Sequence, residues 1–144
     1  MATLNADSAR LALKHQVQSA TDVTGFGLAG HGSEMASASG VDLIISASSL
    51  PLLPGVADLA RAGFCSGGSV RNRQHLGEKL QIDESLEESL ASICLDSETS
   101  GGLLLAVSPD RVDSLKSDLK AAGVAEYAII GEVKAASAIP TVHI

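Results

Sequence analysis

The pattern of apolar and polar residues along the chain predicts an alternation of helices and strands. Apolar positions that recur every three or four residues indicate helices, short apolar runs indicate buried strands, and glycine or proline marks the breaks. The expected helices cover residues 4–16, a segment that ends near Gly40, residues 55–62, a segment that begins near Ser85, and a segment from Ser108 to Gly123. The expected strands cover residues 20–24, 41–45, 103–107, 127–133 and 139–144.

Three of these strands also carry an expectation about their place in the sheet. Residues 103–107 are apolar at every position, which predicts a central strand covered on both faces. Residues 127–133 are expected to form another buried strand. Residues 139–144 are expected at an edge, with Pro140 at the margin, because proline cannot donate a backbone hydrogen bond.

Two polar segments and the two cysteines complete the local predictions. The polar residues 71–75 predict a turn or an irregular helix, typical of an exposed loop or of a mobile lid. Ser85 and Glu88 have the spacing of a capping box at a helix start. Cys94 lies on the apolar face of the helix that follows and is expected to be buried and inert, whereas Cys65 stands beside two glycines and is expected to be exposed.

The order of the elements predicts an α+β domain in which helices pack on a mixed β-sheet. A chain of 144 residues can bury about 70% of its unfolded surface, so we expect residues 1–144 to form a single domain. Few residues join the last two strands, so these strands would pair antiparallel if they were adjacent.

Composition and charge exclude several classes of function. The net charge of −7 argues against a basic surface for a nucleic-acid backbone, and two Phe and one Tyr cannot form a base-stacking platform. No apolar run approaches the roughly 18 residues of a membrane span, and the first residues lack a basic leader. We therefore expect a cytoplasmic protein that binds neither nucleic acid nor a membrane.

The most distinctive stretch is residues 20–31, where a strand delivers Asp22 to a turn with Gly25 and Gly27 and a helix begins behind it. Exposed N–H groups and a helix start attract phosphate, and a neighbouring carboxylate suits Mg²⁺, which prefers one or two carboxylates plus phosphate oxygens. The match to G-x-G-x-x-G is weak alone, because no acidic residue follows about 20 positions later and no Gly-Lys-Ser/Thr is present. A plain tight turn between strand and helix is the alternative.

A second segment, residues 96–102, combines a helix end with hydroxyl residues and glycines that could bind an oxyanion. These residues are Thr99, Ser100, Gly101 and Gly102. In the alternative interpretation, the side chains of Asp96 and Thr99 close the turn by hydrogen bonds to the backbone. His31 could donate toward a phosphate, but a structural hydrogen bond at the helix start is the preferred interpretation.

Together these segments resemble the C-terminal half of the selenophosphate synthetase (selenide, water dikinase) family. The matching segments are Thr21 to His31, Glu34-Met35-Ala36, Pro51 to Gly55, Gly67-Gly68 with Arg71-Asn72, and Asp96 to Leu104. The family belongs to a superfamily with aminoimidazole ribonucleotide synthetase, thiamine-monophosphate kinase and a hydrogenase-maturation protein. The run Thr-Asp-Val-Thr-Gly-Phe-Gly-Leu resembles the selenium family more than these relatives.

The resemblance implies an ATP- and Mg²⁺-dependent phosphotransferase that makes selenophosphate from selenide, ATP and water and releases AMP and phosphate. It also implies two α/β domains, of which the N-terminal one carries the nucleophile, a catalytic lysine and several Mg²⁺-binding aspartates, and mediates homodimer formation. On this chain the resemblance implies that Asp22 is a Mg²⁺ ligand. It further implies that Gly25, Gly27 and the turn at 99–102 line a cleft that faces the N-terminal domain.

The departures from the family matter for activity. No N-terminal domain is present, neither cysteine corresponds to the nucleophile, and Ser97 and Glu98 stand where many members have Pro and Gln. The first residues resemble an internal stretch of the full-length enzyme, so we expect a fragment or separate domain without catalytic residues of its own. The alternatives are a non-catalytic binding or regulatory module of the same fold and a domain of a sister ATP-dependent synthetase.

Overall fold

The computed structural model describes residues 4–124, 126–136 and 138–144. The α-helices of these residues are α1 (Ala6–Lys14), α2 (Gly27–Ser39), α3 (Val56–Arg61), α4 (Gly67–Leu76), α5 (Glu88–Leu95) and α6 (Pro109–Ala121). Short 3₁₀ turns cover Ala47–Ser49 and Gly77–Lys79. The strands are β1 (Ser19–Asp22), β2 (Val41–Ile45), β3 (Leu80–Gln81), β4 (Leu103–Ala106), β5 (Gly131–Ala135) and β6 (Val142–His143).

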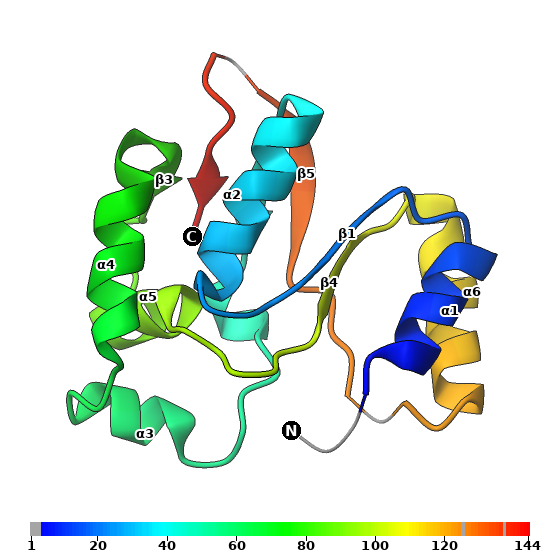
Figure 1. Cartoon of the computed structure of the whole chain (residues 1–144), viewed down its shortest axis with the longest axis horizontal. Coiled ribbons are helices and arrows are strands. Elements are labelled where there is room, and N and C mark those ends of the chain that lie inside the picture. Colours follow the sequence, from blue (N-terminus) through cyan, green and yellow to red (C-terminus); the bar gives the residue numbers. More distant parts are fainter. Residues whose placement is uncertain (1–3, 125, 137) are drawn as a thin grey trace.

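The strands form two sheets. The larger sheet has the order β3-β6-β2-β5, in which β6 runs parallel to both β3 and β2, and β5 runs antiparallel to β2. Strands β1 and β4 form a separate antiparallel pair, which places Asp22 opposite Leu103. Figure 1 shows this pair running between the larger sheet and the packed helices α1 and α6. The predicted α+β class with a mixed sheet is confirmed.

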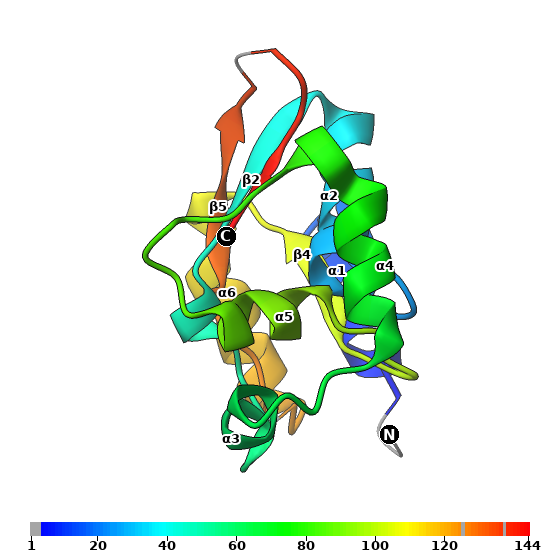
Figure 2. The ribbon, with the colours of Figure 1, turned by 90° about the vertical axis from the view of Figure 1, so that its left-hand side faces the viewer.

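The main core lies where α2, α4 and α5 meet the larger sheet, and Figure 2 shows α2 and α4 on one side of β2 and β5. Its buried residues are Ala29, Ile45, Ala47, Leu76, Cys94, Leu95, Val142 and Ile144. A smaller cluster joins α1 to α6 through Leu11, Leu115 and Leu119. The core is aliphatic, as the composition predicts.

Strand β4 is not the central strand that its apolar residues predict. It pairs with β1 within a two-stranded sheet. Its faces are covered by helices instead of by a layered sheet, because Leu105 packs against the α1–α6 cluster and Leu104 approaches Gly32 of α2. An uninterrupted apolar run indicates that both faces of a strand are buried, but it does not indicate which elements cover those faces.

The expectations for the last two strands are also wrong. The strand expected at 127–133 is β5, which begins at Gly131 and is exposed at all five positions because it is the outermost strand. The strand expected at the edge is β6, whose Val142 is fully buried. It lies inside the sheet because β3, which no sequence signal predicts, pairs with its outer side. The last two strands are not adjacent, so their antiparallel pairing does not arise.

Two helix starts differ from the prediction as well. Residues 71–75 belong to the regular helix α4, whose start is capped by Ser66, because the Ser66 hydroxyl accepts a hydrogen bond from the Gly68 N–H at 3.1 Å. The proposed capping box is absent, since Ser85 donates its N–H and hydroxyl to the Asp83 carboxylate at 2.8 and 2.6 Å, and α5 begins only at Glu88.

Across the described segments, no helix is both long enough and apolar enough to cross a membrane.

A charged contact fixes α1 against α6. Lys14 Nζ donates to Asp118 Oδ2 at 2.7 Å, and His15 Nε2 lies 2.7 Å from the same oxygen. His15 Nδ1 also lies 3.3 Å from the Ser114 hydroxyl. Lys14 first, and His15 second, hold the pKa of the Asp118 carboxyl below its ordinary value.

We expect Asp118→Asn to destabilise the chain at neutral pH but not in strong acid. The pKa of Asp118 is lower in the folded than in the unfolded chain, so its stabilisation is complete above about pH 4 and is lost as the pH falls through the folded pKa. Urea unfolding of both proteins at pH 7, and at several values below pH 4, measures the difference. Asp113→Asn, at a side chain that is 99% exposed, is the control. An equal loss of stability at every pH would contradict the linkage.

Candidate functional site

The two motifs found in the sequence are joined through their backbones. The Val23 N–H donates to the Gly102 carbonyl, and the Gly101 N–H donates to the Val23 carbonyl, both at 3.0 Å. One residue further on, the Glu98 N–H donates to the Thr24 carbonyl at 3.0 Å. The turn after β1 and the turn before β4 therefore form one continuous structure, which we call the double turn (residues 22–27 and 96–102).

Two glycines allow this close contact. Gly27 has φ +68°, and a Cβ on it would stand 2.7 Å from the Asp96 carbonyl oxygen and 2.8 Å from the Leu95 carbonyl. A Cβ on Gly101 would stand 2.5 Å from the Val23 carbonyl oxygen. All three distances are far below van der Waals contact, so these positions exclude any side chain.

The other two glycines of the double turn are open. A Cβ on Gly25 or on Gly102 would meet no atom within 4 Å. Among the hydrogen bonds of the described residues, none uses the N–H of these two glycines or of the exposed Thr99 and Ser100. The double turn therefore presents free backbone donors to its surroundings, as an anion site requires.

Asp22 ends β1 beside these open donors. Its side chain is exposed, and it makes no ion pair with another described residue. One exposed carboxylate next to free N–H groups suits Mg²⁺, which takes the rest of its oxygen ligands from phosphates and water. Within the described ranges, no group of three or more His, Cys, Asp or Glu side chains is placed to hold a metal. Asp22 can thus be one ligand of a shared site.

His31 has the structural role that its position suggests. The side chain is nearly buried, with Nε2 3.0 Å from the Thr24 hydroxyl and Nδ1 3.2 Å from Glu34 Oε2. The imidazole thus ties the first turn of α2 to the residue at which the chain leaves β1.

Two residues that hold the double turn in place were not anticipated in these roles. The buried Asn72 of α4 donates to the carbonyls of Gly25 and Leu95 at 3.1 and 2.8 Å, which ties the first half of the double turn to the last residue of α5. Asp96 Oδ1 accepts from the Ser97 N–H at 3.1 Å, as the alternative of a closed turn requires, but it also accepts from Ser66 and Ser69 at the start of α4. The sequence signal for these contacts is the polar cluster at 66–72, whose partners are distant in the chain.

Comparison with known proteins identifies the family of this chain. Residues 1–142 match the family described as AIR synthase related protein, C-terminal domain. The chain belongs to this family. A selenide, water dikinase of Nitratidesulfovibrio vulgaris is 42% identical over 130 residues, which are 90% of this chain and 37% of that protein. A selenide, water dikinase of Porphyromonas gingivalis has the same identity and coverage. A selenide, water dikinase of Clostridioides difficile is 36% identical over 92% of this chain and 38% of its own length.

The family assignment confirms the resemblance to the C-terminal domain of selenophosphate synthetases. This member of the AIR synthase related family spans a little over a third of the length of the relatives it matches, which are dikinases by name. The relatives therefore contain a further region that this sequence does not cover.

Glu98 introduces a negative charge into the double turn. Its Oε2 lies 2.7 Å from the position that a Cβ on Gly101 would take. Burial raises the pKa of the Glu98 carboxyl, and the neighbouring charge of Asp96 raises it further. The Glu98 carboxylate therefore takes up a proton at a higher pH than an ordinary glutamate does.

We expect Gly27→Ala to cost about 2–4 kcal/mol in the free energy of unfolding, because it adds a backbone clash to the strain of a positive φ. Gly40→Ala is the matched control, because Gly40 has φ +66° but open space around it, and it should cost only about 1 kcal/mol. Urea unfolding of the two variants measures the difference. Equal costs would show that the close contact with Leu95 and Asp96 contributes nothing.

Proposed function

We propose that this chain is the C-terminal domain of a selenide, water dikinase that makes selenophosphate from selenide, ATP and water and releases AMP and phosphate. The proposal is supported by relatives of that name at 36–42% identity over about nine-tenths of the chain. The observation that carries it is the double turn, which joins both motifs of the sequence beside the exposed Asp22. A cytoplasmic location follows from the use of ATP.

In this proposal the residues of the double turn have different roles. Asp22 is the Mg²⁺ ligand, because its exposed carboxylate ends β1 beside the open donors and makes no ion pair with another described residue. Gly25, Gly102, Thr99 and Ser100 face the nucleotide with free N–H groups, whereas Gly27 and Gly101 keep the two halves in contact. When bound, Mg²⁺ would neutralise phosphate charge and orient the phosphate oxygens.

The chain needs a partner for catalysis. Phosphoryl transfer relies on several charged groups acting together, and a lone carboxylate cannot hold Mg²⁺–ATP. We propose that the N-terminal domain of the same enzyme supplies the nucleophile, the lysine and the other aspartates, and that the full-length enzyme is a homodimer. The small-molecule substrates would then bind between the two domains, and this chain contributes no catalytic residue of its own.

The first test is activity with and without that partner. We expect the purified chain alone to form no AMP in the presence of selenide, ATP and Mg²⁺, and we expect activity to return when an N-terminal domain from a relative is supplied. Selenide-dependent AMP formation is the measurement. AMP formation by the chain alone would contradict the proposal, and unchanged Mg²⁺–nucleotide binding on mixing would favour a non-catalytic module.

The second test addresses the metal ligand. In the two-domain assembly, Asp22→Asn should lower metal-dependent turnover about 100-fold, because one charged ligand of the site is lost. The stability of the chain should change by less than about 0.5 kcal/mol, because the side chain is exposed. Asp113→Asn on α6 is the control and should leave turnover unchanged. Full turnover by the Asp22→Asn assembly would show that the ligand assignment is wrong.

A further inference from the structure

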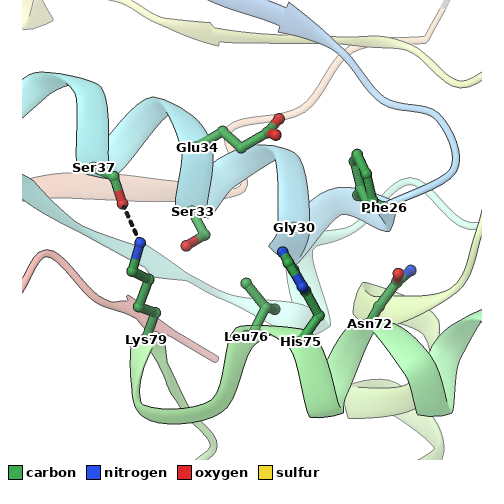
Figure 3. Close-up of a pocket in the computed structure, with 9 residues that line it drawn as sticks. All are labelled: Phe26, Gly30, Ser33, Glu34, Ser37, Asn72, His75, Leu76 and Lys79. Carbon is green, nitrogen blue, oxygen red and sulfur yellow. Dashed lines mark hydrogen bonds between the residues drawn. The ribbon is translucent and has the colours of Figure 1, made fainter.

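A groove runs along α4, on the side that faces α2 and the double turn. It consists of two adjoining hollows of about 410 and 450 Å³, both of which are lined by Phe26, Asn72 and His75. The first hollow continues toward Lys79, and the second toward Arg71 and Ser97. Figure 3 shows the first hollow, with Ser33 and Ser37 of α2 directed toward α4. We call the two hollows together the α4 groove.

The α4 groove carries basic side chains in a chain of net charge −7. Arg71 and His75 are four residues apart on α4, so they share one side of the helix, and Lys79, at the end of the turn that follows, lines the same hollow as His75. Arg71 Nη1 lies 3.3 Å from the position that a Cβ on Gly67 would take, so its guanidinium folds back over the first turn of α4.

These cations lack the acidic partners that other basic residues have. Neither Arg71 nor Lys79 makes an ion pair with any described residue, and Lys79 reaches only the Ser37 hydroxyl, at 3.4 Å. Arg73, two residues along the same helix, instead donates to Glu88 Oε1 at 2.6 Å. Positive charge is therefore left uncompensated on the groove side of α4 and not on its other side.

Two carboxylates close to the groove have other contacts. Glu34 lines the groove, but it contacts the His31 ring at 3.2 Å, and Figure 3 shows its carboxylate directed away from α4. Asp96 Oδ1 is occupied by donors from Ser66, Ser69 and Ser97. The groove also has a fixed shape, because the two hydrogen bonds of Asn72 hold α4 against the double turn.

We propose that the α4 groove binds a phosphate group, with Arg71 as its principal charged contact and with His75 and Lys79 adding positive potential. A guanidinium can hold two phosphate oxygens at once, and it binds best where no carboxylate competes for it. The site needs neither Asp22, which does not line the groove, nor a metal ion. It is therefore distinct from the proposed Mg²⁺ site and can be tested without it.

Phosphate could reach the groove as the free ion or as part of a nucleotide. The Phe26 and His75 rings are stacked in the groove, with centroids 6.1 Å apart and planes inclined by 17°. A nucleoside monophosphate would place its base near these rings, whereas inorganic phosphate would leave the Phe26 ring unperturbed. Inorganic phosphate and a nucleoside monophosphate would both contact Arg71, but only the second would also place a base beside the stacked rings.

The test is a titration of the ¹⁵N-labelled chain, in EDTA and at low salt, with inorganic phosphate and separately with AMP. We expect saturable amide shifts at Gly25, Gly68 and Asn72, with a Kd in the millimolar range. Arg71→Gln should raise this Kd about tenfold or more. Arg73→Gln, the matched control, and Asp22→Asn should each change it less than about twofold. Amide shifts far from the groove verify that every variant is folded.

Each outcome decides the inference. Additional shifts at Phe26 with AMP would identify a nucleotide as the source, and equal responses to both ligands would identify free phosphate. Non-saturable shifts, or equal losses in Arg71→Gln and Arg73→Gln, would overturn the site. A change of Kd in Asp22→Asn alone would also overturn it, by assigning the phosphate to the double turn. Failure of the Mg²⁺ proposal leaves the Arg71 result unaffected.

Discussion

Helix α2 begins in direct backbone contact with the end of α5, and the rest of the site depends on this contact. It exists because Gly27 has no side chain and takes a positive φ, so that its Cα rests against the carbonyls of Leu95 and Asp96. Asn72 then bridges the same two segments from α4. Without this approach, the two motifs would lie on neighbouring elements but would not share hydrogen bonds.

The contact explains why similar glycines have different roles. Gly27 and Gly101 are packing positions, at which a methyl group would overlap a carbonyl, whereas Gly25 and Gly102 border open space. The four glycines are equivalent in the sequence. In the structure, two of them allow the two halves of the double turn to approach, and the other two leave its N–H donors accessible. The exposed Asp22 lies beside the second kind, which is where a ligand could approach.

The sequence could predict the elements whose causes are local. The bounds of β2 match the expected 41–45, and α2 and α6 end at glycines as expected, because apolar periodicity and helix-terminating glycines act within a few residues. The sequence also singles out the residues of the double turn, because the carboxylate and the glycines lie within two short motifs. Their roles in binding remain predictions.

What could not be predicted depends on partners distant in the sequence. The exchange of places between β5 and β6 follows from pairing with β2 and β3, which no local pattern encodes. The polar composition of 71–75 predicts an irregular segment, but these residues belong to α4. The composition could not reveal the contacts of Asn72 with Gly25 and Leu95, because these partners are 47 and 23 residues away in the sequence. Ser85 was misassigned because it binds Asp83 instead of capping α5.

The contrast between the two cysteines has a practical consequence. Cys94 is fully buried, and burial raises the pKa of its thiol to about 11, so very little reactive thiolate forms at neutral pH. Cys65 is exposed, immediately before the residue that caps α4. The folded chain thus has one cysteine thiol that is accessible to a labelling reagent. A fluorophore or spin label can therefore be attached to Cys65 without replacing either cysteine. It would lie beside the N-terminus of α4, where its signal would change if a partner domain or a ligand bound nearby.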